Sequence, residues 1–217
     1  MEHKISVVDF HHEVLTAWSE LRRKVASPPA VWTLDYHTDT MPCFRGAMPP
    51  PLPGAWEDEN AVAEAVRVLR HDEHFDWALR AGIISEAFIG ICGDDNQVTA
   101  HEAMHVCRPA DFPGSDVILN SPERFRPQAE KMLESSFLAA LFPRLPDENE
   151  IYILDIDCDY ILCRQALCPN DDRLIRRLIQ NAALITLSRE NDWVKILKLP
   201  GESISGTEIA SIIASRR

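Results

Sequence analysis

The chain has 217 residues, of which 46% are hydrophobic and 26% are charged, and its formal net charge at pH 7 is −12. A chain of this size buries a substantial core, so we expect a single domain over residues 1–217. The acidic balance argues against general nucleic-acid binding, which depends on Lys and Arg, and favours cationic ligands or metal ions. No apolar run approaches the ~20 residues that span a bilayer. The first residues also lack the blocks of a signal peptide, so we expect a cytoplasmic protein with no membrane partner.

The cysteines form no Cys-x-x-Cys pair and lie in apolar or loop contexts. In a cytoplasmic chain this pattern favours reduced thiols over a disulfide framework or a zinc knuckle. The residues concerned are Cys43, Cys92, Cys107, Cys158, Cys163 and Cys168.

The apolar pattern alternates between strands and helices. A strand, a helix and a second strand near the N-terminus are typical of a βαβ unit and hence of a parallel sheet. The prolines of residues 41–53 exclude regular structure there and indicate a loop that can wall a pocket. We therefore expect a three-layer α/β/α domain with about six mainly parallel strands. In chain order the pattern predicts a strand at 5–8, a helix at 14–25, a strand at 30–34, a helix at 60–80, strands at 87–92 and 116–119, a helix at 121–142, a strand at 150–155, a helix at 172–180, a strand at 182–187 and a helix at 207–215.

Two carboxylate-rich clusters follow buried strands. The first is Asp35-x-His37-x-Asp39, and the second consists of Asp155, Asp157 and Asp159. Alternate residues of an extended segment point the same way, so the members of each cluster can converge on one point. Burying several like charges together is unfavourable unless a cation neutralises them. The two clusters therefore predict a metal site, with enough ligands for two ions.

The mixture of carboxylate and imidazole ligands suits Mn²⁺, Fe²⁺, Ni²⁺ or Zn²⁺ better than Ca²⁺, which prefers oxygen ligands throughout. Water held between two such ions is deprotonated near neutral pH and becomes a nucleophile. The clusters thus indicate a hydrolase with a binuclear centre.

The same residues carry a family resemblance. The segment around Asp35-x-His37-x-Asp39 resembles the Asp-Ala-His-x-Asp element of the arginase and agmatinase ureohydrolases, and the run from Leu154 resembles their Ser-x-Asp-x-Asp element. Those enzymes have a metal-binding His about two dozen residues before the first element. Here His11 and His12 lie 24 and 23 residues before Asp35.

The segment 9–15 together with Leu-Asp-Ile-Asp-x-Asp at 154–159 more closely resembles a shorter arginase/deacetylase-like family. That family includes the peptide arginases of bacterial ribosomal-peptide biosynthesis, which convert arginine side chains of a precursor peptide to ornithine. The resemblance implies two Mn²⁺ ions, a hydroxide that bridges them, an arginine-containing peptide as partner and urea as the second product. Because ureohydrolases often form oligomers, a homo-oligomer is also compatible with it.

The resemblance also implies a ligand set, in two alternative alignments. In the first, Asp35 and Asp155 bridge the two ions, and His37 with Asp157 completes one site. Asp39, with His11 or His12, completes the other and also orients the hydroxide.

In the second alignment the match to the Asp-x-Asp element slides by two residues. Asp157 and Asp159 then become the ligands, and Asp155 becomes a supporting group. The serine of the ureohydrolase element has no counterpart in either alignment, and Tyr36 replaces its alanine.

Two further residues are candidates for catalysis. His101, four residues before His105, can share a helical face with it and protonate the departing amine. Glu190 follows the strand at 182–187 and can bind a guanidinium group through both oxygens. His71 and His74 fall in a charged helical stretch, which predicts side chains that face solvent.

Two other functions stay open at this point. An amide hydrolase of the same fold, such as a deacetylase, would use a single zinc ion. A non-catalytic module that binds a peptide would bind metal weakly and turn nothing over.

Overall fold

The computed structural model describes residues 4–93, 96–111 and 113–216. Within them, a six-stranded sheet is parallel throughout, in the order β1-β6-β5-β2-β3-β4. The predicted α/β fold is therefore confirmed. The strands are β1 (Lys4–Val8), β2 (Ala30–Asp35), β3 (Ala87–Ile91), β4 (Met104–Cys107), β5 (Tyr152–Asp157) and β6 (Leu184–Ser188).

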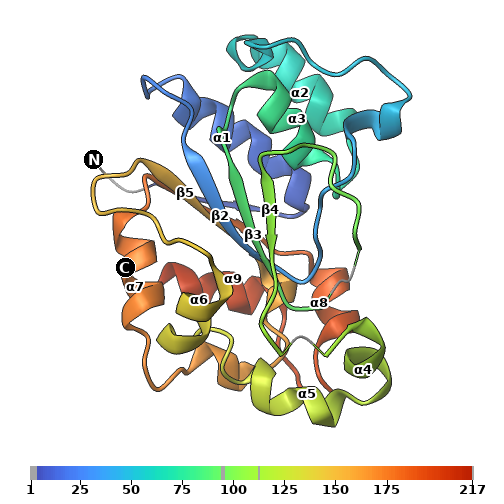
Figure 1. Cartoon of the computed structure of the whole chain (residues 1–217), viewed down its shortest axis with the longest axis vertical. Coiled ribbons are helices and arrows are strands. Elements are labelled where there is room, and N and C mark those ends of the chain that lie inside the picture. Colours follow the sequence, from blue (N-terminus) through green and yellow to red (C-terminus); the bar gives the residue numbers. More distant parts are fainter. Residues whose placement is uncertain (1–3, 94–95, 112, 217) are drawn as a thin grey trace.

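Helices cover both faces of this sheet, which makes three layers (Figure 1). Helices α1 to α3 pack on one face, and α4 to α9 contribute to the core on the other. The helices are α1 (Val14–Arg22), α2 (Glu59–Val68), α3 (His74–Ala81), α4 (Ser115–Asn120), α5 (Pro122–Ala129), α6 (Ser135–Leu141), α7 (Arg173–Asn181), α8 (Asn191–Leu197) and α9 (Gly206–Ala214).

The central strands are buried along their whole length, as expected for a parallel sheet with helices on both sides. Successive side chains alternate between the faces: Val31 joins the core beneath α1 to α3, whereas Trp32 joins the opposite core. Continuing this alternation puts Thr33 and Asp35 on the face covered by α1 to α3. The same holds for Asp155, Asp157 and Thr186 on the neighbouring strands.

The carboxyl ends of β2 and β5 lie side by side at the middle of the sheet. From β2 the chain continues to β3 on one side, and from β5 it continues to β6 on the other side. This is the topological switch point of the sheet, where α/β proteins bind their ligands. Both acidic clusters follow these two strands.

Three predicted elements were wrong. Residues 116–119, predicted as a strand, belong to α4, because a four-residue apolar run carries no period that separates the two structures. The helix predicted at 60–80 is broken between α2 and α3, where the buried carboxylate of Glu73 accepts the backbone N–H groups of Arg70 and Phe44. The helix predicted at 121–142 is likewise divided into α5 and α6.

Smaller differences concern the ends of elements and the edge of the sheet. Strand β4 and helix α8 were not predicted, and His105 lies on β4 rather than on a helix. Helix α9 is capped by Ser205, whose side chain accepts the N–H of Glu208. Strand β5 reaches Asp157, two residues beyond its predicted end, which places Asp155 inside the sheet.

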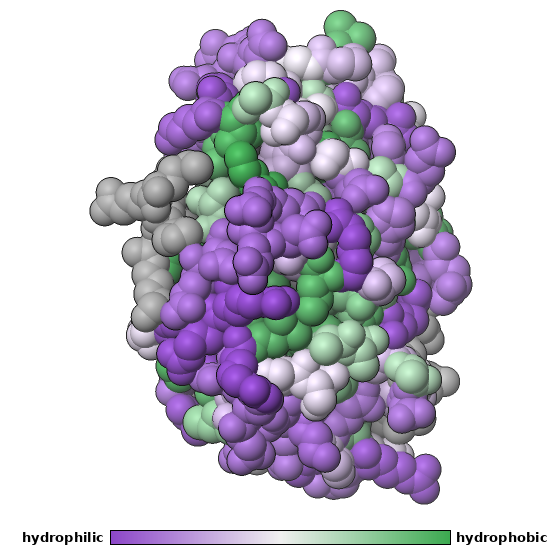
Figure 2. Space-filling view, turned by 60° about the vertical axis from the view of Figure 1, so that its left-hand side comes forward, coloured by the Kyte–Doolittle hydropathy of each residue, from purple (hydrophilic) through white to green (hydrophobic). Residues whose placement is uncertain are grey.

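Two further observations concern the cysteines and the length of the helices. All six cysteines are free thiols. No helix in the described part of the chain has the length and hydropathy to cross a membrane. Figure 2 shows one face of the molecule, on which hydrophilic residues surround a smaller hydrophobic area.

Candidate metal centre

A row of polar side chains crosses the sheet beneath α1. Thr33, Asp155 and Thr186 are register partners on β2, β5 and β6, and all three are fully buried. Thr33 Oγ1 donates to Asp155 Oδ2 at 2.7 Å, and Thr186 Oγ1 donates to Asp155 Oδ1. Thr186 Oγ1 accepts in turn from Trp18 Nε1 of α1 at 3.1 Å. This row forms the floor of the site.

His11 lies directly above the floor. The carboxylate of Glu13 accepts the N–H groups of Asp9 and Phe10 and so turns the chain after β1 into a short 3-10 helix, His11–Glu13. The backbone N–H of His11 donates to Glu190 Oε1 at 2.8 Å. Its side-chain Nε2 lies 2.7 Å from Asp155 Oδ2. These contacts hold the backbone and the ring of His11 in place.

The other ring nitrogen of His11 faces three carboxylates. Nδ1 lies 2.9 Å from Asp39 Oδ2, 3.3 Å from Asp35 Oδ2 and 3.3 Å from Asp157 Oδ2. Asp39 reaches this position from a left-handed backbone conformation with φ +48°, which Asp adopts more readily than most residues. One nitrogen and three oxygens thus converge as ligands of one ion would.

A second group lies beside the first and shares Asp35 with it. His37 Nδ1 lies 3.0 Å from Asp159 Oδ2 and 3.8 Å from Asp35 Oδ1. The Asp159 Oδ2 atom nevertheless has no hydrogen-bond partner, so the contact with His37 lacks hydrogen-bond geometry. Asp159 reaches the site through a 3-10 turn, Cys158–Tyr160, in which Asp157 Oδ1 accepts the N–H of Asp159 at 3.2 Å.

The structure separates the two neighbouring histidines. His11 belongs to the cluster and is 1% exposed. His12 is half-buried, stacks against Phe10 with ring centroids 6.1 Å apart, and belongs to none of the metal-compatible groups of the described residues. The inclusion of His12 as an alternative ligand is therefore not supported by the geometry.

The positions of two other candidates do not support the roles considered for them: Asp155 as a metal ligand and His101 as a proton donor. Both oxygens of Asp155 are already hydrogen-bonded, and Asp155 belongs to none of the metal-compatible groups found among the described residues. His101 lies in the turn before β4, where its Nδ1 accepts the N–H of Ala103 at 3.2 Å. His101 therefore has a local structural contact, and it belongs to none of the metal-compatible groups of the described residues.

His74 belongs to the site although the sequence predicted a solvent-facing side chain. It is fully buried, and its ring centroid lies 4.4 Å from that of His11. Its Nδ1 donates to the carbonyl of His71 at 2.9 Å, and burial lowers its pKa to about 3. The buried positions Trp77, Ala78 and Ala81, at spacings of three, four and seven residues, are the signal that could have placed His74 on the inner face of α3.

Burial and mutual repulsion keep protons on this cluster. Burial raises the pKa of Asp35 to about 8, and the carboxylate of Asp39 adds to the rise. Burial, followed by repulsion from Asp159, raises the pKa of Asp157 well above its usual range. Burial alone would lower the pKa of His37, but Asp159 beside it raises that pKa to about 10. Retained protons thus offset part of the negative charge that the carboxylates bring together.

The donor set fits divalent cations. Among the described residues, the cluster carboxylates form ion pairs with histidines and with no Lys or Arg. Asp35 Oδ2 and Asp159 Oδ2, both fully enclosed, have no hydrogen-bond partner. Unpartnered buried carboxylate oxygens are strongly unfavourable without a cation. Three overlapping groups can each hold an ion: His11, Asp39 and His74; His11, Asp35 and Asp157; and Asp35, His37 and Asp159.

Comparison with known proteins adds no assignment. A scan against protein-family models found no match, and no curated protein matches the sequence significantly.

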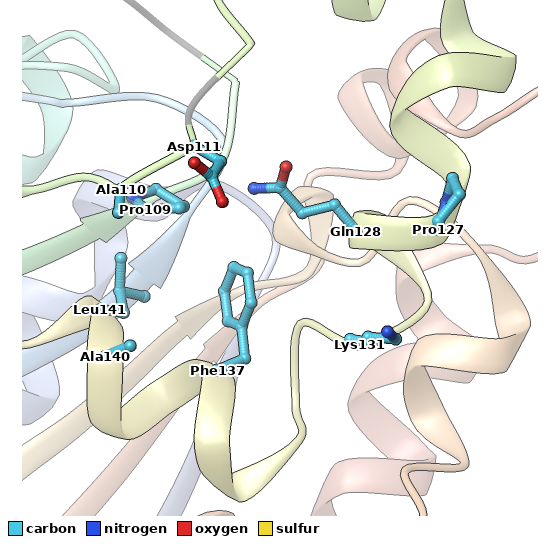
Figure 3. Close-up of a pocket in the computed structure, with 9 residues that line it drawn as sticks. All are labelled: Pro109, Ala110, Asp111, Pro127, Gln128, Lys131, Phe137, Ala140 and Leu141. Carbon is cyan, nitrogen blue, oxygen red and sulfur yellow. The ribbon is translucent and has the colours of Figure 1, made fainter.

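A separate hollow lies between the loop after β4 and helices α5 and α6 (Figure 3). Its volume is about 380 Å³, and Phe137 and Leu141 line one end. Asp111 and Gln128 face each other at the other end (Figure 3). Since its walls contain a single carboxylate and no histidine, it is not a second metal site of the same kind.

Proposed function

We propose that this protein is a metal-dependent hydrolase that converts arginine side chains of a peptide to ornithine and urea. The main support is the pair of ligand groups that share Asp35 at the switch point of the sheet. A shared carboxylate between two groups is the arrangement that a binuclear centre requires. The resemblance of the same segments to the peptide arginases supports the choice of a peptide as substrate.

The geometry favours one of the two ligand alignments. His11 Nδ1, Asp39 and Asp157 would hold one ion, His37 and Asp159 the other, and Asp35 both. The mixed oxygen and nitrogen donors are compatible with Mn²⁺, the ion that the family resemblance implies. When bound, two such ions would supply a water deprotonated near neutral pH and would stabilise the negative charge that develops during hydrolysis.

The charge of the site supports a cationic substrate. Six buried carboxylates surround it: Asp35, Asp39, Asp155, Asp157, Asp159 and Glu190. Two divalent ions carry four positive charges, so the fully ionised site keeps a net negative charge, which a guanidinium group complements. A neutral amide substrate would gain nothing from this excess.

Two side chains have roles that follow from their positions. Glu190 is 5% exposed, and its Oε1 accepts the N–H of His11, which leaves Oε2 available to a guanidinium N–H. Asp39 lies beside the Nδ1 atom of His11, which also faces Asp35, and its carboxylate can accept a proton from the attacking water. Proton donation to the departing amine is assigned to no particular residue.

The decisive experiment measures urea release with added Mn²⁺ from free arginine and from a set of arginine-containing peptides, together with ion stoichiometry. Urea from peptides, two ions per chain and loss of urea release in Asp35→Asn and His37→Ala support the proposal. His105→Ala, which alters a histidine stacked on Phe88 at the sheet edge, serves as the control and should retain activity.

Other outcomes overturn the proposal in distinguishable ways. Two bound ions without urea from any substrate would indicate another reaction. One ion together with amide hydrolysis would indicate a deacetylase. Neither ions nor urea would leave a peptide-binding module.

A further inference from the structure

We propose that Asp155 is a positioning residue that orients His11 for metal binding, rather than a metal ligand. This inference rests on the metal centre of the proposed function, but not on its substrate. It assigns the second acidic cluster two different tasks, because Asp157 and Asp159 face the ligand groups whereas Asp155 lies beneath them.

Hydrogen bonds engage both oxygens of Asp155, and this residue belongs to none of the metal-compatible groups of the described residues. Oδ2 accepts from Thr33 Oγ1 at 2.7 Å and lies 2.7 Å from His11 Nε2, and Oδ1 accepts from Thr186 Oγ1. Asp155 is fully buried, so no solvent competes for these bonds. The three donors come from three different segments of the chain, and each is itself held by the fold.

The contact with Asp155 determines which nitrogen of His11 can bind an ion. A carboxylate with two hydroxyl donors only accepts, so the proton of the shared bond lies on Nε2 of His11. The nitrogen left for a cation is therefore Nδ1, which lies within 3.3 Å of oxygens of Asp35, Asp39 and Asp157. Histidines that bind metals characteristically donate their other N–H to a carboxylate or carbonyl, which fixes the ring and strengthens the ligand.

The floor of the site holds this arrangement rigidly. Trp18 Nε1 donates to Thr186 Oγ1, which donates to Asp155, and Asp155 receives the N–H of His11. The chain of bonds joins α1, β6, β5 and the turn after β1. The rings of His74 and Phe75, with centroids 4.4 Å and 6.0 Å from that of His11, enclose His11 from other directions.

Asp155→Asn is the most informative variant, because the amide oxygen can still accept from His11 while the charge is lost. We expect the affinity for one of the two ions to fall about 10- to 100-fold, as for other second-sphere partners of metal-bound histidines. The ion held by His37 and Asp159 should bind as in the wild type. Calorimetric titration with Mn²⁺ gives both affinities and the stoichiometry.

The matched control is Tyr152→Phe on the same strand. Tyr152 is also buried, and its hydroxyl donates to the carbonyl of Leu178 at 2.7 Å, away from the cluster. Its variant should bind both ions unchanged. Should Asp155→Asn fail to fold, Thr33→Val and Thr186→Val each remove one donor and keep the carboxylate, and we expect each to weaken the same ion by a smaller factor.

A spectroscopic readout tests the orientation directly. Nitrogen-15 NMR of the histidine rings in the Zn²⁺-loaded protein should show the proton of His11 on Nε2 and the ion at Nδ1. A proton on Nδ1 with Zn²⁺ at Nε2 would overturn the inference, as would unchanged affinities in all three variants.

The inference and the proposed function fail separately. Binding of two ions with the predicted loss in Asp155→Asn, but no urea from any peptide, would refute the peptide arginase and leave the role of Asp155 intact. Urea release with unchanged ion affinity in Asp155→Asn would do the reverse. Absence of metal binding in the wild type would refute both.

Discussion

Replacing Asp35 by Asn should stabilise the metal-free protein and destabilise the metal-loaded protein relative to the wild type. Asp35 is fully buried, and its Oδ2 has no hydrogen-bond partner. Its pKa is raised from 3.8 to about 8, first by burial and then by Asp39. A carboxyl group with a raised pKa contributes stability at low pH that is lost as the pH rises towards its folded-state pKa. At pH 8 most of this contribution to the stability of the folded protein is lost.

The magnitude follows from the shift. A rise from 3.8 to about 8 corresponds to about 6 kcal/mol of lost stability at pH 8. Asn avoids this penalty, but burying its incompletely bonded amide costs about 3 kcal/mol. The net gain of about 3 kcal/mol should raise the Tm of the metal-free protein by about 6–12 °C for a chain of this length.

Mn²⁺ should reverse the order of the two proteins. An ion at about 1,000 times its Kd stabilises the wild type by about 4 kcal/mol per site. The variant lacks the carboxylate that both ligand groups share, so it should gain much less. Thermal unfolding at pH 8, with a chelator and then with excess Mn²⁺, measures both effects.

A matched control is Asp76→Asn. Asp76 is also buried, but it pairs with Arg80 at 2.9 Å and accepts the N–H of Cys43 at 2.9 Å. Its replacement should lower the Tm with and without Mn²⁺. If the metal-free Asp35→Asn protein melts below the wild type, the Asp35 carboxylate does not destabilise the metal-free protein, and the reasoning is refuted.

Three further predictions concern binding and catalysis. His11→Ala should lose at least one of the two ions, whereas His12→Ala should bind both, and equal losses in calorimetry would contradict the separation of the two histidines. Metal affinity should rise from pH 6.5 to pH 8, because bound ions replace the protons that Asp35 and His37 retain, with pKa values of about 8 and about 10. Titrations in buffers of different ionisation enthalpy should report proton release, and a pH-independent affinity would contradict this prediction. Glu190→Gln should keep the hydrogen bond from the N–H of His11 and should bind both ions. It should raise the KM for arginine peptides about 10- to 100-fold, which corresponds to one charge-assisted hydrogen bond. Loss of metal with unchanged KM would show that Glu190 supports metal binding instead of substrate binding.

Local sequence signals predicted the central architecture well. The strands that contain Trp32 and Leu154 are continuous apolar runs, and such runs indicate buried parallel strands whatever surrounds them. Asp35-x-His37-x-Asp39 follows one run and the aspartates from Asp155 follow the other, so a convergence of acidic groups at one edge of the sheet was also predictable. The sequence predicted less well those helices whose ends depend on contacts with distant residues. An example is the break between α2 and α3, where Glu73 accepts the backbone N–H of Phe44.

The tertiary structure decided how the site is divided between ligands and supports. Neighbouring residues such as His11 and His12 are chemically identical in the sequence, and only the turn after β1 determines which ring faces the carboxylates. His74 enters because the break before α3 turns its start inwards. Asp155 lies outside the candidate ligand groups, because β5 runs two residues further than its pattern predicts and places this carboxylate between Thr33 and Thr186. Residue types and spacing thus determined that carboxylates and histidines would meet, whereas the register between strands, set by packing over the whole sheet, decided which atoms face one another.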